Sequence, residues 1–152
     1  MLATDQEKKL IMKRILVLLL FAAFITATQI PVHAVQTDEP PITIQYLGIS
    51  SFLITAPDGT QILTDPFSGA PYPFPDGIEA DVVTVSHRHP DHSNVRAVEG
   101  DPIEIRDLEP QEVGMVEITG YHTEHGGSYS GDVNMYVFQS GDVKIVHPGA
   151  PD

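Results

Sequence analysis

Cysteine is absent from the 152 residues of this sequence. Its absence excludes disulfides and any site in which thiolates bind zinc. A transition-metal site in this chain must therefore be built from imidazole and carboxylate groups. If the chain is exported, its stability must come from an apolar core or from a bound metal ion.

Basic residues are also scarce, with 8 lysines and arginines against 21 aspartates and glutamates and a formal net charge of -13. Only four basic residues follow position 34, and they are scattered: Arg88, Arg96, Arg106 and Lys144. A surface of this charge repels polyanions such as DNA and RNA and is a poor partner for anionic membranes. We therefore expect no nucleic-acid partner.

The sequence has no long membrane-spanning run. Its longest apolar stretch, residues 15–25, is short compared with the roughly 20 residues that a membrane span needs. The stretch leads to the small-residue end Val32-His33-Ala34, and four basic residues precede it: Lys8, Lys9, Lys13 and Arg14. A basic start, a short apolar centre and an A-x-A-like end are typical of a secretory signal. We predict a signal peptide over residues 1–34, cleaved after Ala34, with an uncleaved anchor as the alternative.

Cleavage at this position implies export to the periplasm or the extracellular space, with no stable membrane anchor afterwards. Residues 35–41 then form a short linker, and residues 42–152 form a single domain. Strand signals dominate this domain. The run 82–85 is continuous, apolar and β-branched, which fits a strand buried on both faces. Other strands are expected from alternation and turn signals at 42–46, 52–54, 61–64, 103–105, 113–118 (ended by Gly120), 135–138 and 143–146.

Three histidines and one aspartate occupy six positions directly after the buried strand, in His87-Arg88-His89-Pro90-Asp91-His92. In extended backbone, positions i and i+2 point to the same side, so His87 and His89 can reach one ion. Pro90 ends the strand because it cannot donate a ladder hydrogen bond. Asp91 and His92 are then turned toward a neighbouring point. A polar surface loop is the alternative, but the chain has only seven histidines, so we predict a metal-binding loop, with zinc as the metal.

The pattern His-x-His-x-Asp-His after a buried strand resembles the signature of the metallo-β-lactamase superfamily. The segments 44–54 (IQYLGISSFLI), 62–67 (ILTDPF) and 80–94 (ADVVTVSHRHPDHSN) look like the opening of its metal-dependent hydrolases. They look most like the branch that contains the ascorbate-phosphate lactonase. The resemblance runs from about residue 42 to residue 149 and implies an α/β fold. This fold is the αββα sandwich, of which the chain holds the strand-rich N-terminal half only.

The resemblance also implies roles for individual residues. His87 and His89 would bind a first metal ion, and Asp91 and His92 a second, so that one or two Zn²⁺ ions are expected. If Asp91 does not bind the second metal, it would orient the attacking water. Asp91 is therefore the candidate catalytic residue. Asp65 resembles the family aspartate that supports the histidine loop from a neighbouring strand. The alternative for Asp65 is an ordinary turn residue at a strand end.

The third histidine of the first metal site comes later in the family, before a glycine-rich turn. Gly120-Tyr121-His122, followed by Gly126-Gly127, suits that pattern. We therefore prefer His122 as the third ligand, with His125 as the alternative. For either residue, a solvated loop histidine is the competing interpretation.

The chemistry that the resemblance implies is metal-assisted hydrolysis of a small-molecule substrate. Zinc lowers the pKa of bound water from 15.7 to about 7, which supplies hydroxide at neutral pH. The hydroxide would attack the carbonyl or phosphorus centre of an ester, lactone or phosphoester. The sequence has no Gly-x-Ser-x-Gly elbow, phosphate-binding glycine-rich loop or Rossmann fingerprint that would favour another mechanism.

The sequence departs from the family in two places. Ile49 stands where related sequences often carry histidine. Ala150 stands where the segment 143–149 (VKIVHPG) would lead to a metal-bridging aspartate, and His147 matches a family histidine with either a functional or a packing role. The domain also has room for little more than the first half of the family fold.

These departures predict a chain that is truncated after the first half of the fold. Such a chain would expose an open strand edge, through which it could associate with itself. They also make a catalytically inactive, metal-binding remnant the alternative to an active hydrolase.

Overall fold

The computed structural model describes residues 5–10, 12–14, 40–125 and 131–150, and the chain divides into two units between residues 37 and 38. In the first unit, residues 5–10 and 12–14 are helical, and Lys9 forms an exposed ion pair with Asp5. No helix within these described residues is long and apolar enough to cross a membrane. The predicted apolar run, the cleavage position after Ala34 and most of the linker lie outside the described residues.

The second unit begins with a five-stranded sheet in the order β1-β2-β3-β4-β5. Its strands are β1 (Thr43–Gly48), β2 (Ser51–Thr55), β3 (Gln61–Thr64), β4 (Val82–Thr84) and β5 (Ile103–Ile105). β1, β2 and β3 pair in antiparallel fashion, whereas β3, β4 and β5 are parallel. Because parallel strands end at the same edge, the segments that follow β3 and β4 emerge side by side.

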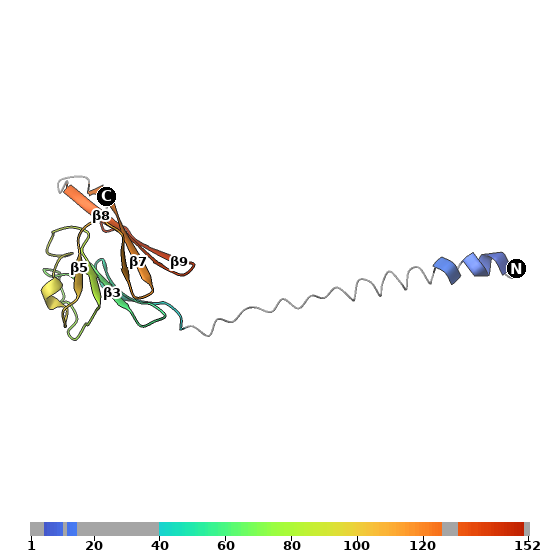
Figure 1. Cartoon of the computed structure of the whole chain (residues 1–152), viewed down its shortest axis with the longest axis horizontal. Helices are drawn as coiled ribbons and strands as arrows, with labels where there is room; N and C mark the ends of the chain where they lie inside the picture. The colour runs from blue at the N-terminus through green and yellow to red at the C-terminus, as the bar shows by residue number, and fades with distance from the viewer. Residues whose placement is uncertain (1–4, 11, 15–39, 126–130, 151–152) are drawn as a thin grey trace. The chain divides into compact units, whose positions relative to one another are not determined.

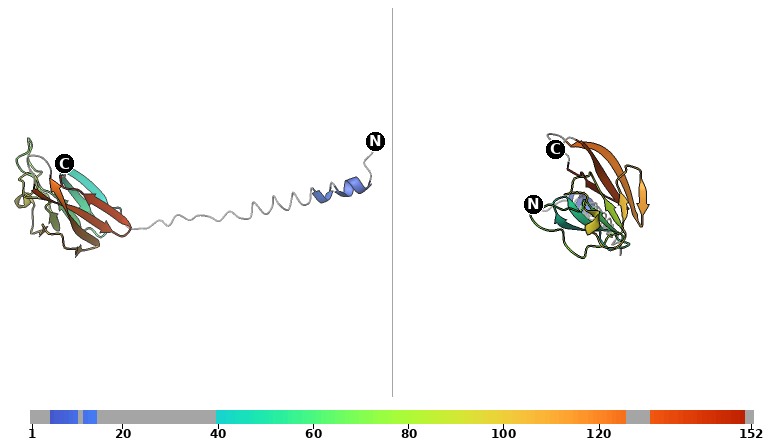
Figure 2. Two further views of the ribbon diagram at one scale, coloured as in Figure 1. Left: turned by 90° about the horizontal axis from the view of Figure 1, so that it is seen from above. Right: turned by 90° about the vertical axis from the view of Figure 1, so that its left-hand side faces the viewer.

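A second sheet contains four antiparallel strands in the order β6-β7-β8-β9. Its strands are β6 (Gln111–Val113), β7 (Val116–His125), β8 (Gly131–Ser140) and β9 (Val143–His147). A short 3-10 helix, η1 (Val95–Ala97), lies between β4 and β5. Figures 1 and 2 show the cyan-to-yellow strands of the first sheet and the orange-to-red strands of the second as two layers. This strand-rich, two-sheet arrangement confirms the predicted fold class.

Apolar side chains fill both faces of the first sheet. Between the sheets, Ile62 and Val82 pack with Tyr136 and Phe138 of β8, all of them buried. On the outer face a second cluster joins the sheet to the loop that follows β3: Leu63, Phe67, Phe74, Val83, Val85 and Val98. β4 is therefore buried on both faces, as its continuous apolar run predicted.

The alternating segment 113–118 folds differently from the prediction. A turn at Gly114 (φ 55°) divides it into β6 and β7, and β7 continues through Gly120 instead of ending there. A Cβ atom at Gly120 would lie 2.8 Å from the carbonyl oxygen of Asp107 and 2.8 Å from Cα of Leu108. Gly120 thus permits a close backbone approach within a strand, and the prediction that it breaks the strand was wrong.

Candidate metal centre

The histidine loop begins at the edge where the parallel strands end. β4 stops at Thr84, and the chain stays buried through Ser86 before it emerges at His87. Asp65 directly follows β3, and its backbone N–H donates to the carbonyl oxygen of Thr84 at 2.9 Å. A backbone hydrogen bond therefore joins the residue after β3 to the end of β4, just before the histidine loop.

The segment after β3 also holds the far end of the histidine loop. The backbone N–H and the hydroxyl of Ser68 both donate to the carbonyl oxygen of Pro90, at 2.9 and 3.1 Å. The backbone N–H of Asn94 donates to the carbonyl oxygen of Pro66 at 2.7 Å, and its side-chain amide donates to that of Phe67 at 3.0 Å. These bonds hold the loop without using its imidazoles.

Asp65 is a fully buried carboxylate that accepts four hydrogen bonds. Oδ1 accepts from the backbone N–H of Ser86 at 2.7 Å, and Oδ2 accepts from the Ser86 hydroxyl at 2.6 Å. Oδ2 also accepts from Nδ1 of His92 at 2.9 Å and from Nε2 of His147 at 3.0 Å. Burial raises the pKa of Asp65, but the hydrogen bonds from His147 and His92 outweigh it and bring the pKa down to about 2. The group is therefore an ionised acceptor at neutral pH.

The Asp65 carboxylate decides which ring nitrogen carries the lone pair in two of the loop histidines. His92 donates its Nδ1–H to Asp65, so its Nε2 carries the lone pair. The Ser86 hydroxyl gives its proton to Asp65 and accepts from Nδ1–H of His87 at 3.0 Å, so Nε2 of His87 also carries a lone pair. A second group that fixes the tautomer in this way is typical of histidines that bind metals.

His87 is held in the neutral form that metal binding requires. Burial of the ring lowers its pKa to about 4, and repulsion from the neighbouring rings of His92 and His89 adds to the effect. At neutral pH the ring is therefore unprotonated, and a neutral imidazole is the form that acts as a ligand.

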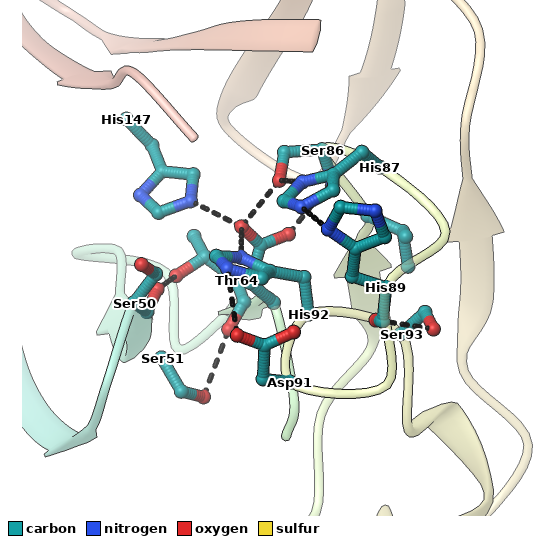
Figure 3. A network of polar contacts seen from close by, with 12 residues as sticks. Ser50, Ser51, Thr64, Ser86, His87, His89, Asp91, His92, Ser93 and His147 are labelled. Atoms are coloured by element: carbon teal, nitrogen blue, oxygen red, sulfur yellow. Dashed lines mark hydrogen bonds and ion pairs between the residues drawn. The ribbon is translucent and has the colours of Figure 1, made fainter. Parts of the chain in front are cut away.

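The three loop histidines lie together, as Figure 3 shows. The ring centroid of His87 is 4.5 Å from that of His89 and 4.2 Å from that of His92. Asp91 is half-exposed, and its Oδ2 lies 3.6 Å from Nε2 of His92. The structure thus brings the four predicted loop residues near one another, with the ring of His87 in contact with the rings of His89 and His92.

Among the described residues, no three His, Asp or Glu side chains have their donor atoms arranged to hold a single ion. Nε2 of His87 instead faces Nδ1 of His89 at 3.0 Å. Two nitrogen ligands of one tetrahedral zinc ion, each about 2.0–2.1 Å from the metal, are roughly 3.3 Å apart. These two nitrogens therefore lie slightly closer together than two ligands of one ion, and the imidazole and carboxylate groups of the loop suit a transition metal in their chemistry.

The two candidates for the third ligand, His122 and His125, are on β7. His122 is on β7 opposite Asn134, its ring is half-exposed, and its Nε2 lies 3.7 Å from Oδ1 of Asp132. His125 is the last residue of β7, and its side chain lies outside the described residues. The choice between His122 and His125 as third ligand stays a prediction.

Two further residues contribute to the site: Ser86, which the sequence-based prediction missed, and His147, whose role the prediction left open. Ser86 connects Asp65 with His87, and the available signal was a hydroxyl residue directly before the histidine loop. His147, for which a packing role was equally expected, forms a buried hydrogen bond with Asp65 across 82 positions of sequence. No local sequence pattern predicts a contact between two residues so far apart in the chain.

Ile49 occupies an unfavourable backbone conformation. Its φ of 52° is in the left-handed region, where β-branched residues are outliers and histidine is enriched. It borders a cavity of about 340 Å³ between the β1–β2 hairpin and the end of β9. Side chains that line this cavity include Ile44, Phe52, Ile54, Ile145 and His147.

Two facing sheets, with a cluster of histidines after a buried parallel strand, define the hydrolase-like fold of metal-dependent enzymes. The family model described as "Beta-lactamase superfamily domain" matches residues 43–151. The chain therefore belongs to the metallo-β-lactamase superfamily, whose members bind metal ions. No curated protein matches the sequence.

Solved structures agree with this assignment. A protein from Thermotoga maritima, assigned as a Zn-dependent hydrolase of the metallo-beta-lactamase superfamily, is 32% identical with a TM-score of 0.57. The match covers 72% of this chain and 50% of that protein, so the chain spans about half the length of this relative.

Two more distant structures share the fold alone. The metallo hydrolase Igni18 from Ignicoccus hospitalis is 17% identical with a TM-score of 0.54, over 72% of this chain and 61% of its own. The diiron β-hydroxylase CmlA from Streptomyces venezuelae is 19% identical with a TM-score of 0.50, over 74% and 30%.

Proposed function

We propose that this protein is an exported zinc-dependent hydrolase that acts on an ester, lactone or phosphoester of a small molecule. The observation that carries the proposal is the hydrogen-bond network of Asp65. It orients the rings of His92 and, through Ser86, of His87, so that the Nε2 lone pair of each ring is the one that would bind a metal.

The roles of the chain's own residues follow from this geometry. His87, His89 and His92 would hold the metal, and Asp91 would be a further ligand or would orient the attacking water. When bound, zinc supplies a Lewis acid and lowers the pKa of its water to about 7. Asp65 keeps the ligand rings in the required orientation and, because it is ionised, strengthens their basicity.

A metal-binding protein without turnover is the second candidate. The methyl group of Ala150 cannot bind a metal, although the resemblance expects a metal-bridging aspartate at this position. Ala150 follows Gly149, where a Cβ atom would lie 2.9 Å from Cβ of Ser86. An aspartate at position 150 would therefore lie close to the start of the histidine loop.

Removal of two imidazoles should abolish metal binding. We expect protein purified without chelator to contain about one zinc ion per chain by elemental analysis, as a histidine site without thiolates can provide. The double variant His87→Ala, His89→Ala should lose this metal because two of its ligands are gone. Arg88→Ala is the matched control, since Arg88 is exposed in the same loop. Equal metal content in the double variant and the control would contradict the proposed site.

Turnover then separates the two candidate functions. Hydrolysis of lactones and phosphodiesters by the metal-loaded protein, lost in the double variant, would support the hydrolase. Bound metal without hydrolysis would support the second candidate. In that case an Ala150→Asp variant that gains turnover would identify Ala150 as the cause.

Export is the second part of the proposal, and it is supported by the basic start, the apolar run 15–25 and the end at Ala34. We expect the protein recovered outside the cytoplasm to begin at Val35. Mass spectrometry of the intact chain measures this, and an exported protein that keeps residues 1–34 would show an uncleaved anchor instead.

A further inference from the structure

His147 forms one of the contacts between the two sheets at the candidate metal centre. Its side chain is buried, and its Nε2–H donates to Oδ2 of Asp65 at 3.0 Å. Asp65 follows β3 of the first sheet, whereas His147 ends β9 of the second. Figure 3 shows His147 on one side of the polar network and His89 on the other.

The hydrogen bond from His147 shares its acceptor atom with the histidine loop. Oδ2 of Asp65 accepts from Ser86 at 2.6 Å, from His92 at 2.9 Å and from His147 at 3.0 Å. A carboxylate carries about four lone-pair sites on two oxygens, so three donors on one oxygen compete for its position. Without His147, Oδ2 would lose its donor from the second sheet, and the carboxylate could rotate away from Nδ1 of His92.

The second sheet also touches the start of the histidine loop directly. The backbone N–H of Asn134 donates to the carbonyl oxygen of Ser86 at 2.8 Å. A Cβ atom at Gly149 would lie 2.9 Å from Cβ of Ser86 and 2.7 Å from Cγ1 of Val133. The end of β9 is therefore tied to the loop by packing at Ser86 and by a hydrogen bond at Asp65.

We propose that His147 is a positioning residue for metal binding, which holds the Asp65 carboxylate so that His92 keeps its Nε2 lone pair directed into the metal centre. Loss of a group that orients a metal ligand typically costs 10- to 100-fold in metal affinity. The proposal rests on the proposed function for the metal itself. The tautomer of His92, however, is a property of the protein with or without metal.

Two variants separate the hydrogen bond from packing. His147→Phe keeps an aromatic ring beside Phe52, whose centroid lies 6.3 Å from that of His147, but removes the donor. His147→Gln keeps an N–H donor and removes the ring. Both are measured in the full chain by zinc competition with a chromogenic chelator and by nitrogen NMR of the His92 ring in metal-free protein. Thermal unfolding of the metal-free variants shows whether each one is folded.

We expect His147→Phe to bind zinc roughly 10- to 100-fold more weakly than the unsubstituted protein. We also expect it to populate both tautomers of His92. His147→Gln should retain both the affinity and the single tautomer with Nδ1 protonated. A folded His147→Phe with unchanged affinity and tautomer would overturn the proposal and leave His147 as a packing residue. If the unsubstituted protein binds no zinc, the proposed function fails, and the His92 tautomer in His147→Phe alone then decides the positioning role.

Discussion

Replacement of Asp65 by alanine should lower the free energy of unfolding by at least about 3 kcal/mol, because each buried donor left without an acceptor costs roughly 1–3 kcal/mol. Three side-chain donors would be affected, on Ser86, His92 and His147. Urea denaturation at neutral pH, followed by an optical signal, measures this loss. Zinc affinity should fall in the same variant, because His87 and His92 would no longer be held in one tautomer.

The matched control for this variant is Asp81→Ala. Asp81 is an exposed carboxylate that, like Asp65, accepts a backbone hydrogen bond, in this case from Gln61 at 2.8 Å. Its removal should cost no more than about 1 kcal/mol, since solvent replaces the lost acceptor. Equal losses in the two variants would mean that the burial of Asp65 and its four bonds do not determine its effect.

The same carboxylate should make stability depend on acid. The folded-state pKa of Asp65 is about 2, below its ordinary value of 3.8, so the unfolded chain takes up a proton first as the pH falls. The contribution is therefore fully present above about pH 4 and is lost between pH 4 and 2, a change of roughly 2 kcal/mol. Asp65→Asn should flatten this decline. It should not abolish it, since a hydrogen bond from the backbone of Thr60 also lowers the pKa of Asp58.

Replacement of Phe67 by alanine should destabilise the protein by about 3–5 kcal/mol, the range for large-to-small substitutions of buried aromatic residues. Phe67 is fully buried and packs edge-on against Phe74 and Tyr72, with ring centroids 5.3 and 5.6 Å away. Its carbonyl oxygen also accepts the side-chain amide of Asn94. The cavity should therefore loosen the support of the histidine loop as well as the core. The midpoint of urea denaturation measures the first effect, and zinc affinity measures the second.

Tyr72→Ala tests whether burial explains this effect. Tyr72 contacts the same ring of Phe67 but is 47% exposed. Its loss should cost less than about 1.5 kcal/mol, close to the contribution of one aromatic pair. A Tyr72→Ala variant as unstable as Phe67→Ala would show that the aromatic contact, and not the enclosed volume, stabilises this cluster.

Much of the fold could be predicted because its strands carry local signals. The alternation at 42–46 and the strand signals at 52–54 and 61–64 each coincide with an observed strand, and the continuous apolar run of β4 reflects burial on both faces. The error at Gly120 has the same origin. Glycine alone indicates a strand break as readily as a close contact, and only the approach of Asp107 and Leu108 shows which applies.

The candidate site was less predictable than the fold. The cluster of His87, His89 and His92 could be inferred because six neighbouring positions cannot separate widely in space. The role of Ser86 and the contact of His147 with Asp65 could not, because they depend on rotamers and on the packing of two sheets. The same limit applies to His122 and His125, which stand far from the loop in sequence.

By itself, the sequence determined the family, the strand content and the identity of a histidine-rich loop after a buried strand, because each depends on residues close together in the chain. Only the tertiary structure decided how that loop is held. β3 and β4 are parallel and end at one edge, which places Asp65 beside Ser86. The second sheet then brings His147 to the same carboxylate. A buried charge needs several donors at once, and here they come from two segments, the loop after β4 and the end of β9, that only the packed fold brings together.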